Sequence, residues 1–181
     1  WIKRCVDLDA GKWNSTDAKV KDAILYGIKS GDIWLNKIKY DDKARRIFGN
    51  VCLEVYLPSR GTCLLQHCNL GACEIGQISE AFILGMSQLC ELHSRTGVGS
   101  TGEYLPSETD KQVGLGLLGL ANLLRRYRVT YEDFGYALAD VNAGKPAYGI
   151  AGEIAKAIKL GIESASTIAR NHGMVRAFAI A

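Results

Sequence analysis

The sequence has little of what marks several non-globular classes of protein. Proline is scarce, at 3 of 181 residues, and only 23% of the residues are charged. With 48% hydrophobic residues, this composition is typical of a soluble globular domain and excludes collagen-like, coiled-coil and disordered chains. The longest nearly unbroken apolar run, 113–124, is too short to span a bilayer, and the N-terminal segment holds no apolar signal-peptide core.

The chain also lacks a large excess of charge of either sign. The chain has 22 Lys and Arg against 19 Asp and Glu, a net charge of +3. Nucleic-acid-binding proteins usually concentrate far more positive charge on one face. The densest basic cluster (Arg125, Arg126 and Arg128) ends a predicted helix, where cations complement the helix dipole. We therefore expect neither a nucleic acid nor a membrane as a partner.

Strand patterns interleaved with helical patterns predict an α/β fold with mostly parallel pairing. One helix is expected to begin after Asn14, Ser15 or Asp17 and to end at Gly31. Further helices are expected over 41–48, 77–93, 116–127, 131–141 and 147–171, strands within 49–75 and over 174–181, and a loop over 94–109. An apolar strand-like run reaches Ala181, so we expect 1–181 to be a piece of one domain that is truncated at both ends.

Three glycines spell G-x-G-x-x-G, the fingerprint of dinucleotide binding, at Gly114, Gly116 and Gly119. That function requires a buried strand that leads directly into the first glycine. The preceding residues, 108–112, are too polar for such a strand. We therefore expect these small residues to allow close packing of a helix, and no dinucleotide site.

Cysteine is abundant, with 6 residues, four of them within 52–73. A disulfide scaffold is not expected in a chain of this length and apolar content, and no C-x-x-C pair indicates structural zinc. Cys63, Cys68, Cys73 and His67 leave open a soft-metal or iron–sulfur site, although no standard ligand spacing is met. The other interpretation of a free cysteine is a small buried apolar side chain, which we expect for Cys5, Cys73 and Cys90.

Polar and apolar residues alternate over 50–55. In an extended strand, Asn50, Cys52 and Glu54 therefore share one face, and the outer two lie about 13 Å apart. A thiol hydrolase would need an imidazole base near Cys52, and the histidines are remote in sequence. Radical chemistry fits the trio better, because a thiyl radical removes a hydrogen next to a hydroxyl while a carboxylate takes the hydroxyl proton.

These residues resemble the catalytic chain of ribonucleotide reductases. The matching landmarks, in order, are Asn50-x-Cys52-x-Glu54, Leu57-Pro58, Cys63, Asn69-Leu70-Gly71-Ala72, 110–121 and 176–181. Residues 1–49 match only loosely. In many members the redox cysteine stands directly before Asn-Leu-Gly, which would select Cys68, whereas in others it stands six residues ahead, which selects Cys63. We expect Cys63 to be the redox cysteine, because it also lies closer in sequence to Cys52 than Cys68 does.

The resemblance implies part of a ten-stranded α/β barrel with a central finger loop that carries the radical cysteine. It implies that Cys52 is the transient thiyl that takes the ribose 3′ hydrogen, that Glu54 takes the 3′-hydroxyl proton, and that Asn50 orients substrate and Glu54. It further implies that Cys63 is half of a thiol pair that supplies two electrons and becomes a disulfide. Its partner cysteine, on this view, precedes Trp1.

The resemblance also implies partners and a compartment. The substrate is a ribonucleoside di- or triphosphate, the reductant is a thioredoxin or glutaredoxin type, and nucleotide effectors bind elsewhere in the parent chain. The radical comes from adenosylcobalamin, which the short interval between Cys52 and Cys63 favours, or by relay from a separate di-metal subunit. A cytoplasmic location is expected, no metal ligands are assigned within this chain, and a homodimer is one option.

Overall fold

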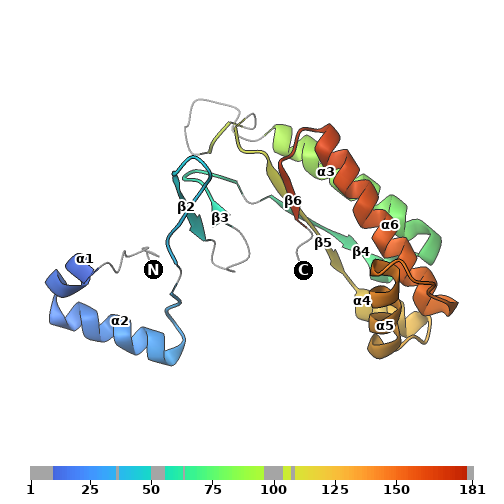
Figure 1. The fold of residues 1–181 in the computed structure, drawn as a ribbon, viewed down its shortest axis with the longest axis horizontal. Coiled ribbons are helices and arrows are strands. Elements are labelled where there is room, and N and C mark those ends of the chain that lie inside the picture. The colour runs from blue at the N-terminus through green and yellow to red at the C-terminus, as the bar shows by residue number, and fades with distance from the viewer. Residues whose placement is uncertain are drawn as a thin grey trace. The chain divides into compact units, whose positions relative to one another are not determined.

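The computed structural model describes residues 10–35, 37–49, 56–62, 64–95, 104–106 and 109–178. The chain divides into two compact units, Trp1–Arg46 and Ile47–Ala181, and Figure 1 draws the helices and strands of both. Helices and small sheets occur together, so the predicted α/β class is confirmed in its coarser form. Within the described ranges no sheet closes on itself.

The first unit is mostly helical. Helix α1 (Ala10–Ser15) is followed by α2 (Ala18–Ser30), and the short strand β1 (Lys39–Tyr40) comes later. Asp17 caps α2, because its side chain accepts hydrogen bonds from two backbone amides of the first turn. Gly31 ends α2 in the left-handed conformation, with φ at 84°. Both ends of this helix are where the sequence predicts them.

The helix predicted over 41–48 is wrong. The Asp41 carboxylate accepts hydrogen bonds from the backbone amides of Lys43 and Arg45, both at 2.9 Å, and so closes a tight turn. Strand β2 (Arg46–Gly49) follows directly. The short polar side chain of an aspartate competes with helical hydrogen bonding in this way, which favours a turn.

The second unit contains a three-stranded parallel sheet. Its strands are β4 (Leu65–Asn69), β5 (Gln112–Leu118) and β6 (Arg176–Phe178), and they lie in the order β4-β5-β6. His67 pairs with Gly116 in the register of β4 and β5. The sheet therefore has the same strand order in space as in sequence.

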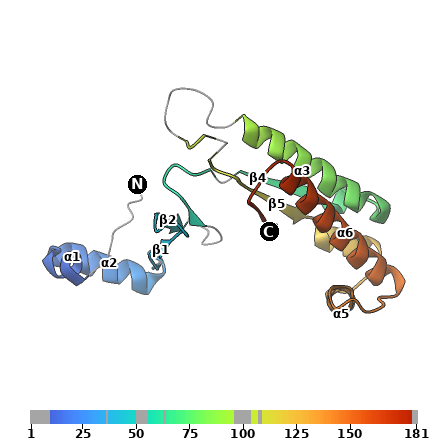
Figure 2. The same cartoon turned by 45° about the horizontal axis from the view of Figure 1, so that its top comes forward.

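The helical elements of this unit are the 3-10 turns η1 (Leu70–Ala72) and η2 (Ile75–Gln77) and the helices α3 (Ile78–Ser94), α4 (Leu120–Arg126), α5 (Tyr131–Asn142) and α6 (Gly149–Asn171). The two long helices, α3 and α6, contact the parallel sheet. Helix α3 packs on β4 and β5, and α6 packs along α3. Figures 1 and 2 show α3 and α6 side by side over the same face. No helix of the described residues is long and apolar enough to cross a membrane.

Close contacts through glycine hold the helices to each other and to the sheet. A Cβ on Gly161 of α6 would lie 2.7 Å from the Phe82 ring of α3, so this helix pair packs with no room for a side chain at 161. A Cβ on Gly85 of α3 would lie 3.0 Å from the Cys68 sulfur and 3.1 Å from Leu115. Cys68 and Leu115 are both buried, so these contacts form the core between α3 and the sheet.

Besides α2, three predicted helices are confirmed. The expected ranges 77–93, 131–141 and 147–171 correspond to α3, α5 and α6. The helix predicted over 116–127 is wrong in its first part, because the chain stays extended to Leu118 and α4 begins only at Leu120. Periodicity cannot separate a short, fully apolar buried strand from a buried helix, which accounts for the error.

Candidate functional site

The four residues predicted to carry chemistry lie outside the described residues. They are Asn50, Cys52, Glu54 and Cys63. The strands on either side of the trio are described: β2 pairs antiparallel with β3 (Tyr56–Leu57), and Gly49 is the register partner of Tyr56. Residues 50–55 therefore connect two antiparallel partners in sequence.

The segment before Cys63 is fixed by a buried carboxylate. Asp110 is 4% exposed and Thr62 6% exposed. The Asp110 carboxylate accepts a hydrogen bond from the Thr62 backbone amide and a second from the Thr62 hydroxyl at 2.9 Å. Its other oxygen accepts from the Gln112 side-chain amide at 3.1 Å. Asp110 begins the landmark 110–121, but no pattern in the sequence predicts Asp110 or Thr62 as a site residue.

The parallel sheet has one face that α3 covers and a second face opposite to it. Gln66 and Cys68 of β4 point toward α3, since Gln66 donates to Gln88 at 3.0 Å and the Cys68 thiol donates to the Ala81 carbonyl oxygen at 3.3 Å. Side chains alternate along a strand, so the other residues of β4 point to the opposite face. Those residues are Leu65, His67 and Asn69.

Strand β5 presents glycine beside His67 on the face away from α3. Leu115 packs against Gly85 of α3, so Gly114 and Gly116 belong to the opposite face by the same alternation. Two of the three glycines of G-x-G-x-x-G thus lie inside strand β5. The dinucleotide fingerprint requires the strand to end before the first glycine, so these glycines do not form it. The expected use of these glycines in helix packing is wrong for Gly114 and Gly116.

The third glycine meets the Asn-Leu-Gly landmark at the carboxyl ends of β4 and β5. Gly119 has φ at 70°, and a Cβ there would lie 2.7 Å from both Asn69 Oδ1 and the Gly71 amide nitrogen. The same Asn69 oxygen accepts a hydrogen bond from the Gly71 amide at 3.1 Å. Two sequence landmarks that are about fifty residues apart are therefore in direct contact.

Arg126 joins the two segments that meet at this corner. Its guanidinium donates to the carbonyl oxygens of Gly71 and Cys73, both at 2.8 Å, and to the Glu74 carboxylate at 2.9 Å. The Tyr127 hydroxyl also donates to Glu74, and this hydrogen bond raises the pKa of the Tyr127 phenol. The basic cluster at the end of α4 thus includes an arginine with specific partners, in addition to the expected dipole effect.

The described members of the cysteine and histidine set do not converge. Cys68 lies on the face toward α3 and His67 on the other face, while the Cys73 thiol donates to the Asn69 carbonyl oxygen at 3.4 Å. Within the described ranges, no three His, Cys, Asp or Glu side chains gather where they could hold a metal. Burial raises the pKa of the Cys68 thiol, and the neighbouring Cys73 raises it further.

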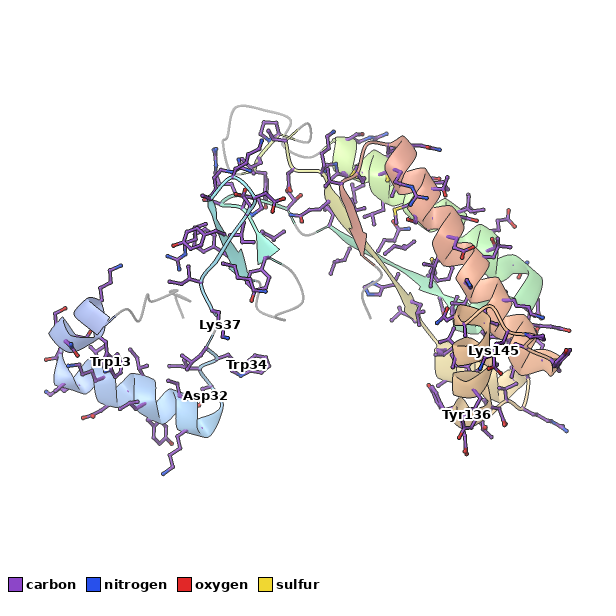
Figure 3. All side chains as sticks on the ribbon, viewed as in Figure 1. Trp13, Asp32, Trp34, Lys37, Tyr136 and Lys145 are labelled. Carbon is purple, nitrogen blue, oxygen red and sulfur yellow. The ribbon has the colours of Figure 1, made fainter. Side chains whose placement is uncertain are left out.

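A shallow hollow of about 490 Å³ lies where α4, α5 and the start of α6 meet. Tyr136, labelled in Figure 3, is one of its exposed lining residues. Arg128 lines it together with Asp133 and Asp140, so charges of both signs face the same space. This mixture defines no ligand class.

Comparisons with known proteins give no family assignment. No known family matches the chain, and no curated protein matches it.

Proposed function

We propose that this chain belongs to the catalytic part of a ribonucleotide reductase, which reduces ribonucleotides to 2′-deoxyribonucleotides for DNA synthesis. The observation that carries the proposal is the ordered set of landmarks that begins with Asn50-x-Cys52-x-Glu54. The contact between Asn69 and Gly119 supports it, because it brings two later landmarks together at the carboxyl ends of parallel strands. In α/β enzymes, that edge of the sheet is where sites are built.

The strand order supports the barrel that this function would need. In β4-β5-β6 the strands are parallel and sequential, α3 packs on β4 and β5, and α6 packs along α3 and on β6. A barrel is built from such units, because its helices form one outer layer and the other sheet face turns inward. A doubly wound sheet would instead place helices on both faces. We propose that the face bearing His67 and Gly116 is the inner one.

The flanking strands support a finger loop. Because β2 and β3 are antiparallel partners, residues 50–55 connect the arms of a hairpin in sequence. A hairpin tip is a suitable carrier for a side chain that must reach the centre of a barrel. Cys52 and its neighbours Asn50 and Glu54 occupy that connection.

The proposed roles balance as one two-electron reduction. Cys52, as a thiyl radical, takes the 3′ hydrogen and later returns a hydrogen, while Glu54 accepts the 3′-hydroxyl proton and Asn50 orients both by hydrogen bonding. The 2′ oxygen leaves as water. Cys63 and a second thiol provide two electrons and two protons and become a disulfide, which a thioredoxin or glutaredoxin-type protein reduces.

The generator of the radical is outside these steps. Adenosylcobalamin or a separate di-metal subunit would supply the oxidising equivalent to Cys52.

Cys63 is the better redox candidate than Cys68. Cys68 is 6% exposed and bonds to the Ala81 carbonyl of α3, on the face away from the proposed barrel interior. Its raised pKa also disfavours the thiolate that must react in disulfide exchange. Cys63 follows Thr62, which is hydrogen-bonded to Asp110, two residues before β5 begins.

Substitution of Cys52 tests the proposal in the full-length protein. Cys52→Ser should abolish deoxynucleotide formation and leave nucleotide binding within about twofold, because serine keeps the shape and cannot form the radical. Cys73→Ser is the matched control, since Cys73 lies outside the proposed steps, and it should retain activity. Substantial turnover by Cys52→Ser would overturn the assignment. A stoichiometric zinc or iron content that is lost on Cys68→Ala would favour the metal-binding module instead.

A further inference from the structure

A buried pair of hydrogen bonds links Asp110 and Thr62 in the second unit. Both residues are buried, and they are 48 positions apart in sequence. Burying a carboxylate costs free energy unless hydrogen bonds replace its water. Here the Asp110 carboxylate accepts bonds from the Thr62 amide, the Thr62 hydroxyl and Gln112. Among the described residues the donors are Thr62 and Gln112, and Thr62 provides two of the three bonds, so this carboxylate acts chiefly on Thr62.

The residue after Cys63 is hydrogen-bonded to strand β5. The Leu64 carbonyl oxygen accepts a hydrogen bond from the Gly114 amide of β5 at 2.9 Å. Thr62 is held by Asp110, two residues before β5 begins at Gln112. The chain is therefore hydrogen-bonded on both sides of position 63. Leu64 is bonded to β5 itself, and Thr62 is bonded to the Asp110 side chain just before β5.

We propose that Asp110 is a positioning residue for Cys63, an inference that rests on the proposed function. By holding the Thr62 amide and hydroxyl, Asp110 fixes where the backbone enters position 63, and with it the approach of the thiol to the nucleotide. Reduction of a bound substrate is sensitive to such placement, since about 1 Å of displacement can cost a hundredfold in rate. The role is distinct from catalysis, because Asp110 touches neither substrate nor the reacting sulfur in the proposed steps.

A different prediction follows if Asp110 only stabilises the fold. Its loss would then lower stability and the amount of folded enzyme, while the folded fraction would keep its turnover number. A positioning role predicts instead that kcat falls and the KM for the nucleotide stays, because the nucleotide is bound by other parts of the protein.

The experiment uses the full-length reductase with Asp110→Ala and Asp110→Asn. Asparagine keeps one oxygen that can accept from Thr62, so it should restore most of what alanine loses. The matched control is Asp133→Ala, because Asp133 forms a second Thr–Asp pair, accepting from the Thr130 hydroxyl at 2.6 Å at the start of α5. That pair contributes to folding and lies outside the proposed chemistry.

We expect Asp110→Ala to lower kcat at least about tenfold with KM within about twofold, Asp110→Asn to stay within about threefold of the parent, and Asp133→Ala to leave both unchanged. Alkylation of Cys63 by iodoacetamide should speed up in Asp110→Ala, and that of buried Cys90 should not. An unchanged kcat in folded Asp110→Ala would overturn the inference, and an unchanged Cys63 alkylation rate would show that Asp110 does not hold this segment.

The two proposals fail in different ways. If the unsubstituted full-length protein forms no deoxynucleotide, the proposed function fails. Alkylation of Cys63 and hydrogen exchange at the Thr62 amide still report whether Asp110 holds this segment. If the unsubstituted protein is active and Asp110→Ala matches it in kcat, only the positioning role fails.

Discussion

Gly119 lies directly against Asn69, at the junction where two parallel strands give way to helical turns. A Cβ at position 119 would come within 2.7 Å of Asn69 Oδ1, and the same oxygen already accepts a hydrogen bond from the Gly71 amide. Glycine is required here for two reasons, the positive φ of 70° and the lack of space. This contact packs the residue that follows β5 directly against the last residue of β4.

Gly119→Ala should therefore destabilise the protein more than its backbone conformation alone explains. Gly144→Ala is the matched control, because Gly144 has φ at 71° and no atom lies within 4 Å of the place that a Cβ would take. We expect a loss of about 3 kcal/mol in the free energy of unfolding at 119 and about 1 kcal/mol at 144, measured by urea denaturation. Equal losses would show that the close approach to Asn69 carries no energy.

Alanine at Gly161 and Gly135 should have effects of opposite sign. Gly161→Ala pushes a methyl group into the Phe82 ring, so we expect it to cost about 1–3 kcal/mol of stability. Gly135 is an exposed position in α5 with open space around it, so Gly135→Ala should gain about 0.5–1 kcal/mol by helix propensity. Thermal or urea unfolding measures both. A Gly161→Ala protein with the same free energy of unfolding as the parent would contradict the tight packing of α3 on α6.

Alkaline pH should weaken the fold through two buried thiols. Burial raises the pKa of Cys68 and of Cys90 above the ordinary value of 9.0. The unfolded chain ionises these thiols first, so their contribution to stability is complete below about pH 9 and is lost as pH rises through the folded pKa values. In reducing buffer, the free energy of unfolding of the Cys68→Ala, Cys90→Ala double variant should fall less steeply above about pH 9 than that of the parent. Parallel pH curves would refute this.

Separate removal of Cys63 and Cys68 should identify the redox thiol in the full-length protein. Cys63→Ala should lower repeated turnover with a thioredoxin-type reductant about a hundredfold or more, because the disulfide cannot form. Cys68→Ala should keep most of the activity and lose about 1 kcal/mol of stability, because the side chain packs under α3. The reverse pattern would assign the redox role to Cys68.

The sequence was most informative where the structure is set locally. The ends of α2 follow from Asp17 and Gly31, and the helical spacing of α3 and α6 is long enough to be unambiguous. Only the last residues of β5, 116–118, fall within the helix predicted over 116–127, because the apolar run continues almost unbroken into α4. The Asp110–Thr62 link had no local signal, since only the tertiary fold joins residues 48 positions apart. The roles of Asn50, Cys52, Glu54 and Cys63 stay predictions.

The anchoring of Gly71, Cys73 and Glu74 by Arg126 has a consequence for folding kinetics. The partners are 52 to 55 positions apart in sequence, so a long loop must close before any of these hydrogen bonds can form. The strand-to-helix corner should consequently gain its protection from amide exchange late, together with α4 and after the local turns of α3. Pulse-labelled exchange at the Cys73 amide, which bonds to the Leu70 carbonyl, would date this step.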